Sequence, residues 1–72
     1  MDRQEDALRK LGLRLRQLRE ERGLSIAELA ILTALAPSDI TTMEAGELDI
    51  PVTTIVALAR ALGTTPARLL TY

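Results

Sequence analysis

The 72-residue sequence predicts an all-α protein with five helices. Hydrophobic residues make up 47% of the chain, and they are almost all Leu, Ala, Ile and Val, with one Tyr and no Phe or Trp, which favours closely packed helices. Leucines recur at helical spacing near the start, and residues that begin and end helices punctuate the rest. So short a chain buries little surface, so we expect one domain over residues 1–72 with modest stability.

The first helix is expected over about residues 4–22. Charged residues occupy its outer face, and its apolar stripe is formed by Leu8, Leu11, Leu15 and Leu18. Gly23 is expected to end it, because glycine adopts positive φ at little cost. Gly12 lies inside this helix at a cost of about 1 kcal/mol relative to Ala, so this turn is either soft or closely packed.

Two short helices are expected over about residues 26–33 and 37–45. Ser25 and Glu28 have the spacing of a capping box, in which each side chain satisfies the other residue's backbone amide. Pro37 suits the first position of the next helix because its missing N–H is not needed there. The connection between the two helices is therefore short.

The last two helices are expected over about residues 52–62 and 66–70. Gly63 is expected to close the fourth helix, and Pro66 to open the fifth. The end of the chain is apolar, through Leu69, Leu70 and Tyr72. These side chains either pack on the first helix or form a dimer interface, and we expect the second because a small core gains from burial in an oligomer.

The composition argues against catalysis. The chain has no Cys and no His, so it lacks disulfides, the thiolate and imidazole metal ligands and the usual proton shuttles. We expect no enzymatic activity, no metal site and no cofactor. No apolar run approaches the roughly 20 residues of a membrane span, and no secretory signal opens the chain, so we expect a cytoplasmic protein.

Charge is distributed unevenly although the net charge is only −1. Seven of the nine basic residues precede Gly23. Between Gly23 and Ala59 there is no Lys or Arg, and the acidic residues are Glu28, Asp39, Glu44, Glu47 and Asp49. The middle of the chain is therefore acidic and its beginning is basic.

Residues 26–45 have the spacing of a helix-turn-helix, with small Ala30 where two helices approach and apolar Leu35 after the turn. From Leu11 to about Leu70 the chain resembles the lambda-repressor-like family, which includes phage repressors, Cro proteins and the controller proteins of restriction systems. The matching thread is Leu18-Arg19, Gly23-Leu24-Ser25, Glu28-Leu29-Ala30, Ile40, Met43-Glu44, Gly46, Ala59 and Leu62-Gly63.

This resemblance implies a five-helix fold, duplex DNA as partner and a homodimer whose two recognition helices lie about 34 Å apart. It implies a structural ion pair between Arg19 and Glu44. It also implies that the third helix and its flanks face DNA, through Ile26, Pro37, Ser38, Asp39, Thr41, Thr42, Glu47 and Asp49. Three cations of the first helix are candidates for phosphate contacts from the side, namely Arg9, Arg16 and Arg22.

The DNA-facing set departs from a strong DNA reader. It contains no Arg, Lys, Gln or Asn, which make the bidentate contacts to base edges. Ile26 replaces a glutamine that is frequent in the family, while Glu47 and Asp49 would repel phosphates. Asp39 also has a structural interpretation, because a carboxylate in the first turn of a helix stabilises the helix dipole. Ile26 also has a structural interpretation, in which its side chain packs on Leu48 or Ile50.

A second departure is Ala34, which replaces the usual turn glycine. Either it adopts the left-handed conformation, at a cost of about 1 kcal/mol, or the turn differs.

Two functions therefore remain. The first is a small homodimeric transcriptional regulator with an unusually acidic DNA-facing surface. The second is a protein-interaction module that keeps the fold but has weakened or lost DNA binding. In the second case Ile26 and Leu48, together with Ile31 and Leu32, would meet a protein partner.

Overall fold

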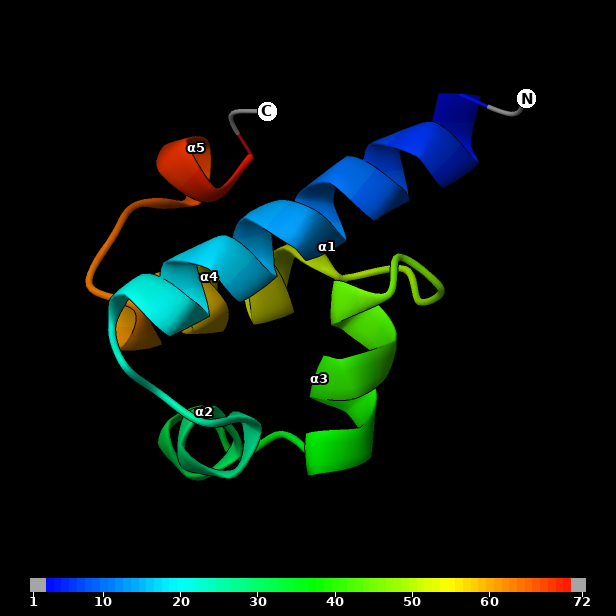
Figure 1. Ribbon diagram of the computed structural model, residues 1–72. Helices are drawn as coiled ribbons and strands as arrows, with labels where there is room; N and C mark the ends of the chain where they lie inside the picture. Colours follow the sequence, from blue (N-terminus) through cyan, green and yellow to red (C-terminus); the bar gives the residue numbers. More distant parts are fainter. Residues whose placement is uncertain (1–2, 71–72) are drawn as a thin grey trace.

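The structure is a computed structural model that describes residues 3–70. Within this range it contains no strand and five helices, which are α1 (Arg3–Glu21), α2 (Ile26–Thr33), α3 (Pro37–Glu44), α4 (Val52–Ala61) and α5 (Pro66–Leu69) (Figure 1). The all-α prediction with five helices is confirmed. Each helix begins and ends within one residue of the expected bounds.

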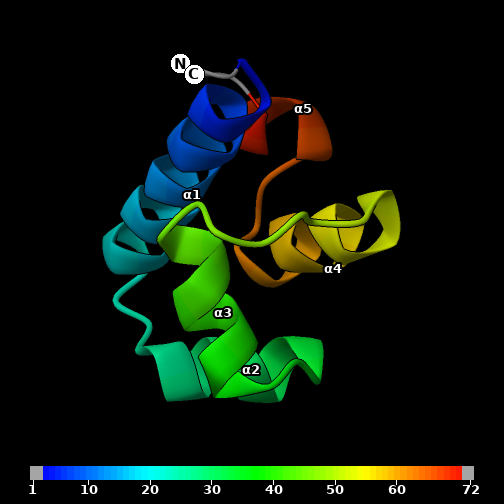
Figure 2. The same ribbon diagram turned by 90° about the vertical axis from the view of Figure 1, so that its right-hand side faces the viewer.

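The long helix α1 crosses one end of the molecule, while α2 and α3 form the opposite end (Figures 1 and 2). α1 contacts α3 and α5, and α4 contacts α2 and α5. In both views the first and last described residues lie near the same end as α5, far from α2. The α2–α3 unit therefore lies away from the first and last described residues.

One cluster of buried side chains holds the helices together, and every helix contributes to it. Its members are Leu11, Leu15, Leu29, Ala30, Ile40, Met43, Ile55, Leu58, Ala59, Leu62 and Leu69. Full burial of a side chain such as Leu or Ile contributes about 1.5–3 kcal/mol. Because only one stripe of α1 packs into this core, the other faces of the helix remain available for charged side chains.

The helix boundaries follow from the expected capping residues. The Ser25 hydroxyl accepts the Glu28 amide at 3.0 Å, and the Glu28 carboxylate accepts the Ser25 amide at 2.9 Å, so the capping box of α2 is complete. Gly23 has φ +67° and its N–H donates to the Glu20 carbonyl as α1 ends. The chain thus turns sharply into α2.

Ala34 resolves the alternative for the turn after α2. It adopts φ 61° and ψ 24°, which is the left-handed conformation that glycine usually supplies. It is the one non-glycine residue with positive φ within residues 3–70. The turn therefore keeps its geometry and accepts the cost of a methyl group in a strained position.

Gly12 is closely packed rather than soft. A Cβ added here would lie 2.4 Å from the Met43 carbonyl oxygen and 2.7 Å from that of Glu44. The end of α3 therefore approaches the backbone of α1 so closely that no side chain fits between them.

The sequence suggested that Leu69 lies at a dimer interface, whereas the structure buries it inside the monomer. Only 1% of this residue is exposed, because α5 inserts it into the core between α1 and α4. The next residue, Leu70, is 43% exposed and faces solvent. Tyr72 lies outside the described residues.

No single helix within residues 3–70 has the length and apolarity to cross a membrane, and only the bent α2–α3 pair meets the criterion when its two helices are combined.

Candidate nucleic-acid interface

Helices α2 and α3 form a helix-turn-helix at the end of the molecule opposite α5 (Figure 1). Their directions differ by 113°, within the approximately 90–120° that characterises this motif. Ala30 is buried beneath the turn, and Leu35 packs against the same core from the other side of it. This packing fixes the angle at which α3 leaves the turn.

The exposed face of α3 carries most of the expected DNA-facing residues. Ile40 and Met43 point into the core, so the first turns present the opposite face to solvent. Pro37, Ser38, Asp39 and Thr41 are exposed and Thr42 is half-buried. The structure therefore brings the residues expected on the recognition helix to one surface.

The polar groups on this surface are mainly hydrogen-bond acceptors. The Thr41 hydroxyl donates to the Pro37 carbonyl at 3.2 Å, and the Thr42 hydroxyl donates to the Ser38 carbonyl at 2.8 Å. Both hydroxyl protons are thus used within the helix, and Asp39 when ionised only accepts. In a major groove such groups match the amino hydrogens of cytosine and adenine and not the acceptor edge of guanine.

The ion pair between Arg19 and Glu44 joins α1 to α3. Arg19 Nε lies 2.6 Å from Glu44 Oε2, and Arg19 Nη2 donates to Glu44 Oε1 at 3.0 Å. The third guanidinium nitrogen, Nη1, donates to the Leu24 carbonyl at 2.8 Å. The hydrogen bond to Glu44 raises the pKa of Arg19 above its usual value. Both side chains therefore hold α1 against α3.

Arg16 shares a hollow with two of the residues expected to face DNA. This hollow of about 320 Å³ lies between α1 and the helix-turn-helix, and it is also lined by Ile26 and Thr41. Arg16 is exposed and lies 3.6 Å from Glu20 on the same helix. Such an exposed pair is weak, so the guanidinium can exchange its carboxylate partner for a phosphate.

Arg9 lies beside the acidic loop that follows α3. Arg9 and Glu47 line one hollow of about 370 Å³, together with Gly46. A Cβ on Gly46 would lie 2.6 Å from Arg9 Cα, so the loop runs directly against α1. A phosphate that approached Arg9 here would also meet the Glu47 carboxylate.

Arg22, a candidate for a phosphate contact, and Ile26, expected to face DNA, both make contacts within the protein. Arg22 Nη2 donates to the Gly63 carbonyl at 3.1 Å, which directs Arg22 toward the connection between α4 and α5 and away from α3. Ile26 is half-buried and packs against the core, as do Leu48 and Ile50. The first residue of α2 therefore serves packing and presents no hydrogen-bonding side chain.

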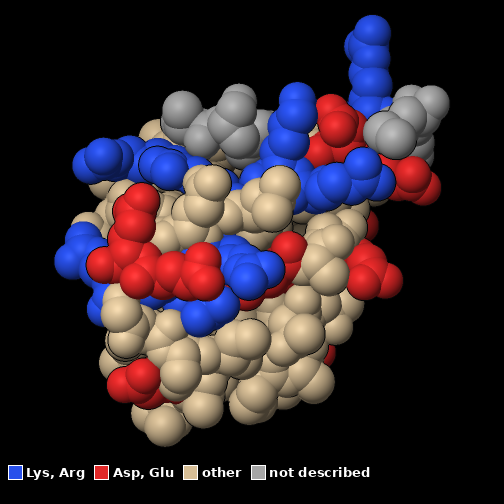
Figure 3. Space-filling view, in the orientation of Figure 1, with Lys and Arg blue, Asp and Glu red and all other residues tan. Residues whose placement is uncertain are grey.

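Figure 3 shows how little positive charge reaches the helix-turn-helix on the face that it displays. Blue Lys and Arg side chains gather over the α1 end, while the lower half over α2 and α3 is largely uncharged with a small acidic area. Glu47 and Asp49 in the loop after α3 are both exposed. The surface around α3 is thus neutral to acidic.

Two large apolar side chains interrupt the solvent face of α2. Ile31 is 81% exposed and Leu32 is 58% exposed. With Leu24 and Glu28 they surround a shallow hollow of about 290 Å³. Exposed apolar clusters of this kind are typical of surfaces that bind another macromolecule.

Within residues 3–70, no group of three or more acidic side chains is arranged to hold a metal ion.

Comparison with known proteins extends these observations. A protein-family model described as a helix-turn-helix domain matches residues 10–70. Among solved structures, the restriction-modification controller protein C.AhdI from Aeromonas hydrophila is 40% identical, with a TM-score of 0.84; the match covers 86% of this chain and 94% of that one. A search of curated proteins gave no significant match.

Two other structures are similar at lower identity. The clp gene regulator ClgR from C. glutamicum is 26% identical with a TM-score of 0.86, and the match covers 89% of this chain and 82% of that one. The hypothetical transcription factor NHTF from Neisseria is 27% identical with a TM-score of 0.87, and the match covers 99% of this chain and 82% of that one. These neighbours share the lambda-repressor-like arrangement of helices.

Proposed function

Because the chain belongs to the helix-turn-helix domain family, we propose that it is a transcriptional regulator that binds duplex DNA in the cytoplasm through α3. The observation that carries this proposal is the exposed face of α3, which the packing of Ala30 and Leu35 on the core and the Arg19–Glu44 pair hold in a fixed orientation. The similar controller and regulator proteins support it. The chain offers no His or Cys for catalysis, so we propose a binding protein and not an enzyme.

The contacts to DNA divide into two kinds. Pro37, Ser38, Asp39, Thr41 and Thr42 are proposed to meet base edges, with a preference for the amino groups of cytosine and adenine. Arg16 is proposed to anchor a phosphate at the edge of α3, and Arg9 a second one. In the proposed complex, Ile26, Glu47 and Asp49 lie beside the major groove of the DNA and contact no phosphate. The binding is therefore weaker than in a relative with a basic loop.

The regulator is proposed to be a homodimer. Leu70 is exposed beside the core, and Val52 and Val56 are further apolar side chains exposed on α4, which contacts α5. Tyr72, which the sequence also suggests for the interface, lies outside the described residues. Sedimentation equilibrium of the wild-type chain and of Leu70→Glu tests it, since a wild-type monomer at micromolar concentration would disprove the dimer.

DNA binding is tested by a fluorescence anisotropy titration at low salt. The probes are a mixed-sequence duplex and a duplex from the chain's own promoter. Wild type is compared with a variant of the α3 face, Ser38→Ala with Thr42→Ala. We expect tighter binding to the promoter duplex, a steep decrease with salt and reduced discrimination in the variant. Equal affinity of wild type and variant for both duplexes would exclude α3 as the reading element.

The second candidate function is a protein-interaction module. Ile31 and Leu32 favour it, because both are largely exposed on a helix that otherwise packs well. This function predicts that no duplex is bound even at low salt. It also predicts that Ile31→Ser with Leu32→Ser abolishes binding to the protein partner without affecting the fold.

A further inference from the structure

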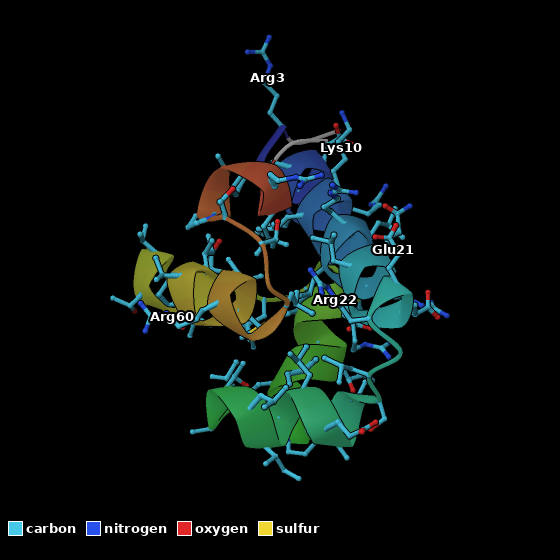
Figure 4. All side chains as sticks on the ribbon, turned by 90° about the vertical axis from the view of Figure 1, so that its left-hand side faces the viewer. Arg3, Lys10, Glu21, Arg22 and Arg60 are labelled. Atoms are coloured by element: carbon cyan, nitrogen blue, oxygen red, sulfur yellow. The ribbon has the colours of Figure 1, made fainter. Side chains whose placement is uncertain are left out.

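A second cationic surface lies on the side of the molecule formed by α1, α4 and α5. Figure 4 looks at this side, and its labels mark Arg3, Lys10, Arg22 and Arg60 around the three helices. Arg14 Nε donates to the backbone carbonyl of Arg68 at 3.3 Å, which joins α1 to α5 along this side. We define the basic face as Arg3, Lys10, Arg14, Arg22, Arg60 and Arg68.

The spacing of these residues on α1 explains why they lie together. Positions 3, 10, 14 and 21 are separated by seven, four and seven residues, so they share one flank of the helix. Three of them are cations, and Glu21 near the end of the helix is the exception. The apolar stripe of α1 packs into the core beside this flank, on which Arg3, Lys10 and Glu21 are exposed and Arg14 is half-buried.

Most of the positive charge on the basic face is not neutralised. Lys10 pairs with Asp6 at 3.2 Å, while the ion pairs Arg16–Glu20 and Arg19–Glu44 involve cations of α1 outside the basic face. The five arginines of the basic face therefore have no carboxylate of this range within 4.0 Å. Arg14 and Arg22 donate only to backbone carbonyls, which leaves their charges in place. Five exposed cations and the half-buried Arg14 thus lie beside two carboxylates, Asp6 and Glu21.

The arrangement fits a polymer of phosphates. α1 is 19 residues long, and a helix of this length extends roughly 28 Å, far enough to run along several phosphates of a backbone. Guanidinium groups bind phosphate oxygens in a bidentate geometry, and each contact releases condensed counterions. Such contacts need no particular sequence, because they touch only the backbone.

We propose that the basic face is a second, sequence-independent binding surface for the nucleic-acid backbone, separate from the exposed face of α3. It supplies the electrostatic attraction that the neutral to acidic surroundings of α3 lack. The chain therefore meets nucleic acid through two faces with different tasks, one for sequence and one for charge. This surface acts whether or not α3 reads bases.

Two double variants of equal charge test the proposal. Arg60→Gln with Arg68→Gln removes two exposed cations from the basic face, while Arg9→Gln with Arg16→Gln removes two cations beside the helix-turn-helix. Affinity for a short mixed-sequence duplex is measured by fluorescence anisotropy from about 50 mM salt upward. Circular dichroism and sedimentation velocity of each variant report on its fold and its assembly.

The expected result is a loss of roughly tenfold or more in affinity for the first variant at low salt, with the slope of log affinity against log salt reduced by about 1.8. An unchanged affinity and slope would overturn the proposal, as would a wild-type chain that binds no duplex. A change in self-association with unchanged duplex affinity would also overturn it and assign the face to a second copy. Loss in the first variant alone would uphold the basic face and remove the phosphate contacts proposed at Arg9 and Arg16.

Discussion

At the scale of single residues, Arg19 connects α1 to α3 and to the segment before α2. Its side chain is 11% exposed and that of Glu44 is 8% exposed, so the two charges depend on each other for solvation. Arg19 also holds the Leu24 carbonyl, which fixes the chain between α1 and α2. One guanidinium therefore sets the position of both helices of the helix-turn-helix relative to α1.

Replacing Arg19 by Met is expected to lower the free energy of unfolding by about 3–5 kcal/mol, because Glu44 would remain buried without a partner. Urea denaturation followed by circular dichroism measures the change. The matched control is Arg16→Met, which breaks the exposed pair with Glu20 and is expected to cost no more than about 0.5 kcal/mol. Equal losses in the two variants would contradict the role of burial.

Glu28 gives the start of α2 a dependence on pH. Its pKa is lowered below the usual 4.5 because its carboxylate accepts the backbone N–H of Ser25 and interacts with the Ser25 hydroxyl. A pKa that is lower in the folded state stabilises the fold above the pKa of the unfolded chain, and this contribution is lost as pH falls through the folded-state pKa. The capping box is therefore weakened in acid.

The difference in unfolding free energy between wild type and Glu28→Gln is expected to be larger at about pH 6 than at about pH 3. Urea denaturation at both pH values measures it. Glu20→Gln serves as a control because the Glu20 carboxylate takes part in no helix cap and forms only an exposed pair with Arg16. A wild-type advantage that stayed constant between the two pH values would argue against a contribution from the Glu28 charge.

At the scale of helices and turns, the elements that local chemistry encodes could be predicted. The capping box placed the start of α2, Pro37 and Pro66 opened α3 and α5, and glycine ended α1. Features that depend on a distant neighbour could not be predicted. The contact between Gly12 and the α3 carbonyls and the burial of Leu69 both arise from helices that meet only after folding.

Ala34 shows the limit of local reasoning in the turn itself, because two conformations were compatible with the sequence. Replacing it by Gly is expected to raise the free energy of unfolding by about 1 kcal/mol, since a left-handed residue no longer carries a Cβ. Thermal and urea denaturation check this value. The control Ala27→Gly, at an exposed position within α2, is expected to lower stability by up to about 1 kcal/mol. A destabilising Ala34→Gly would contradict the strain.

At the scale of the whole molecule, charge separates the two ends of the fold. Arg3, Lys10 and Arg14 lie on one flank of α1, and Arg60 of α4 and Arg68 of α5 lie on the same side of the molecule. The acidic middle of the sequence supplies the helix-turn-helix. The positions of charged residues in the sequence predicted this asymmetry. The basic face could not be predicted, because the contact between Arg14 and Arg68 depends on the packing of α5 against α1.

Glu47 and Asp49 are the exposed carboxylates after α3, where a phosphate would approach if DNA lies along that helix. Replacing both by Lys is expected to raise affinity for a mixed-sequence duplex roughly tenfold or more at low salt and to steepen the salt dependence by about 1.8. Fluorescence anisotropy over a salt series measures both quantities. Glu5→Lys with Glu20→Lys changes the net charge equally on α1 and serves as the control. If both variants bind DNA equally more tightly, net charge alone explains the gain and the loop does not border the bound duplex.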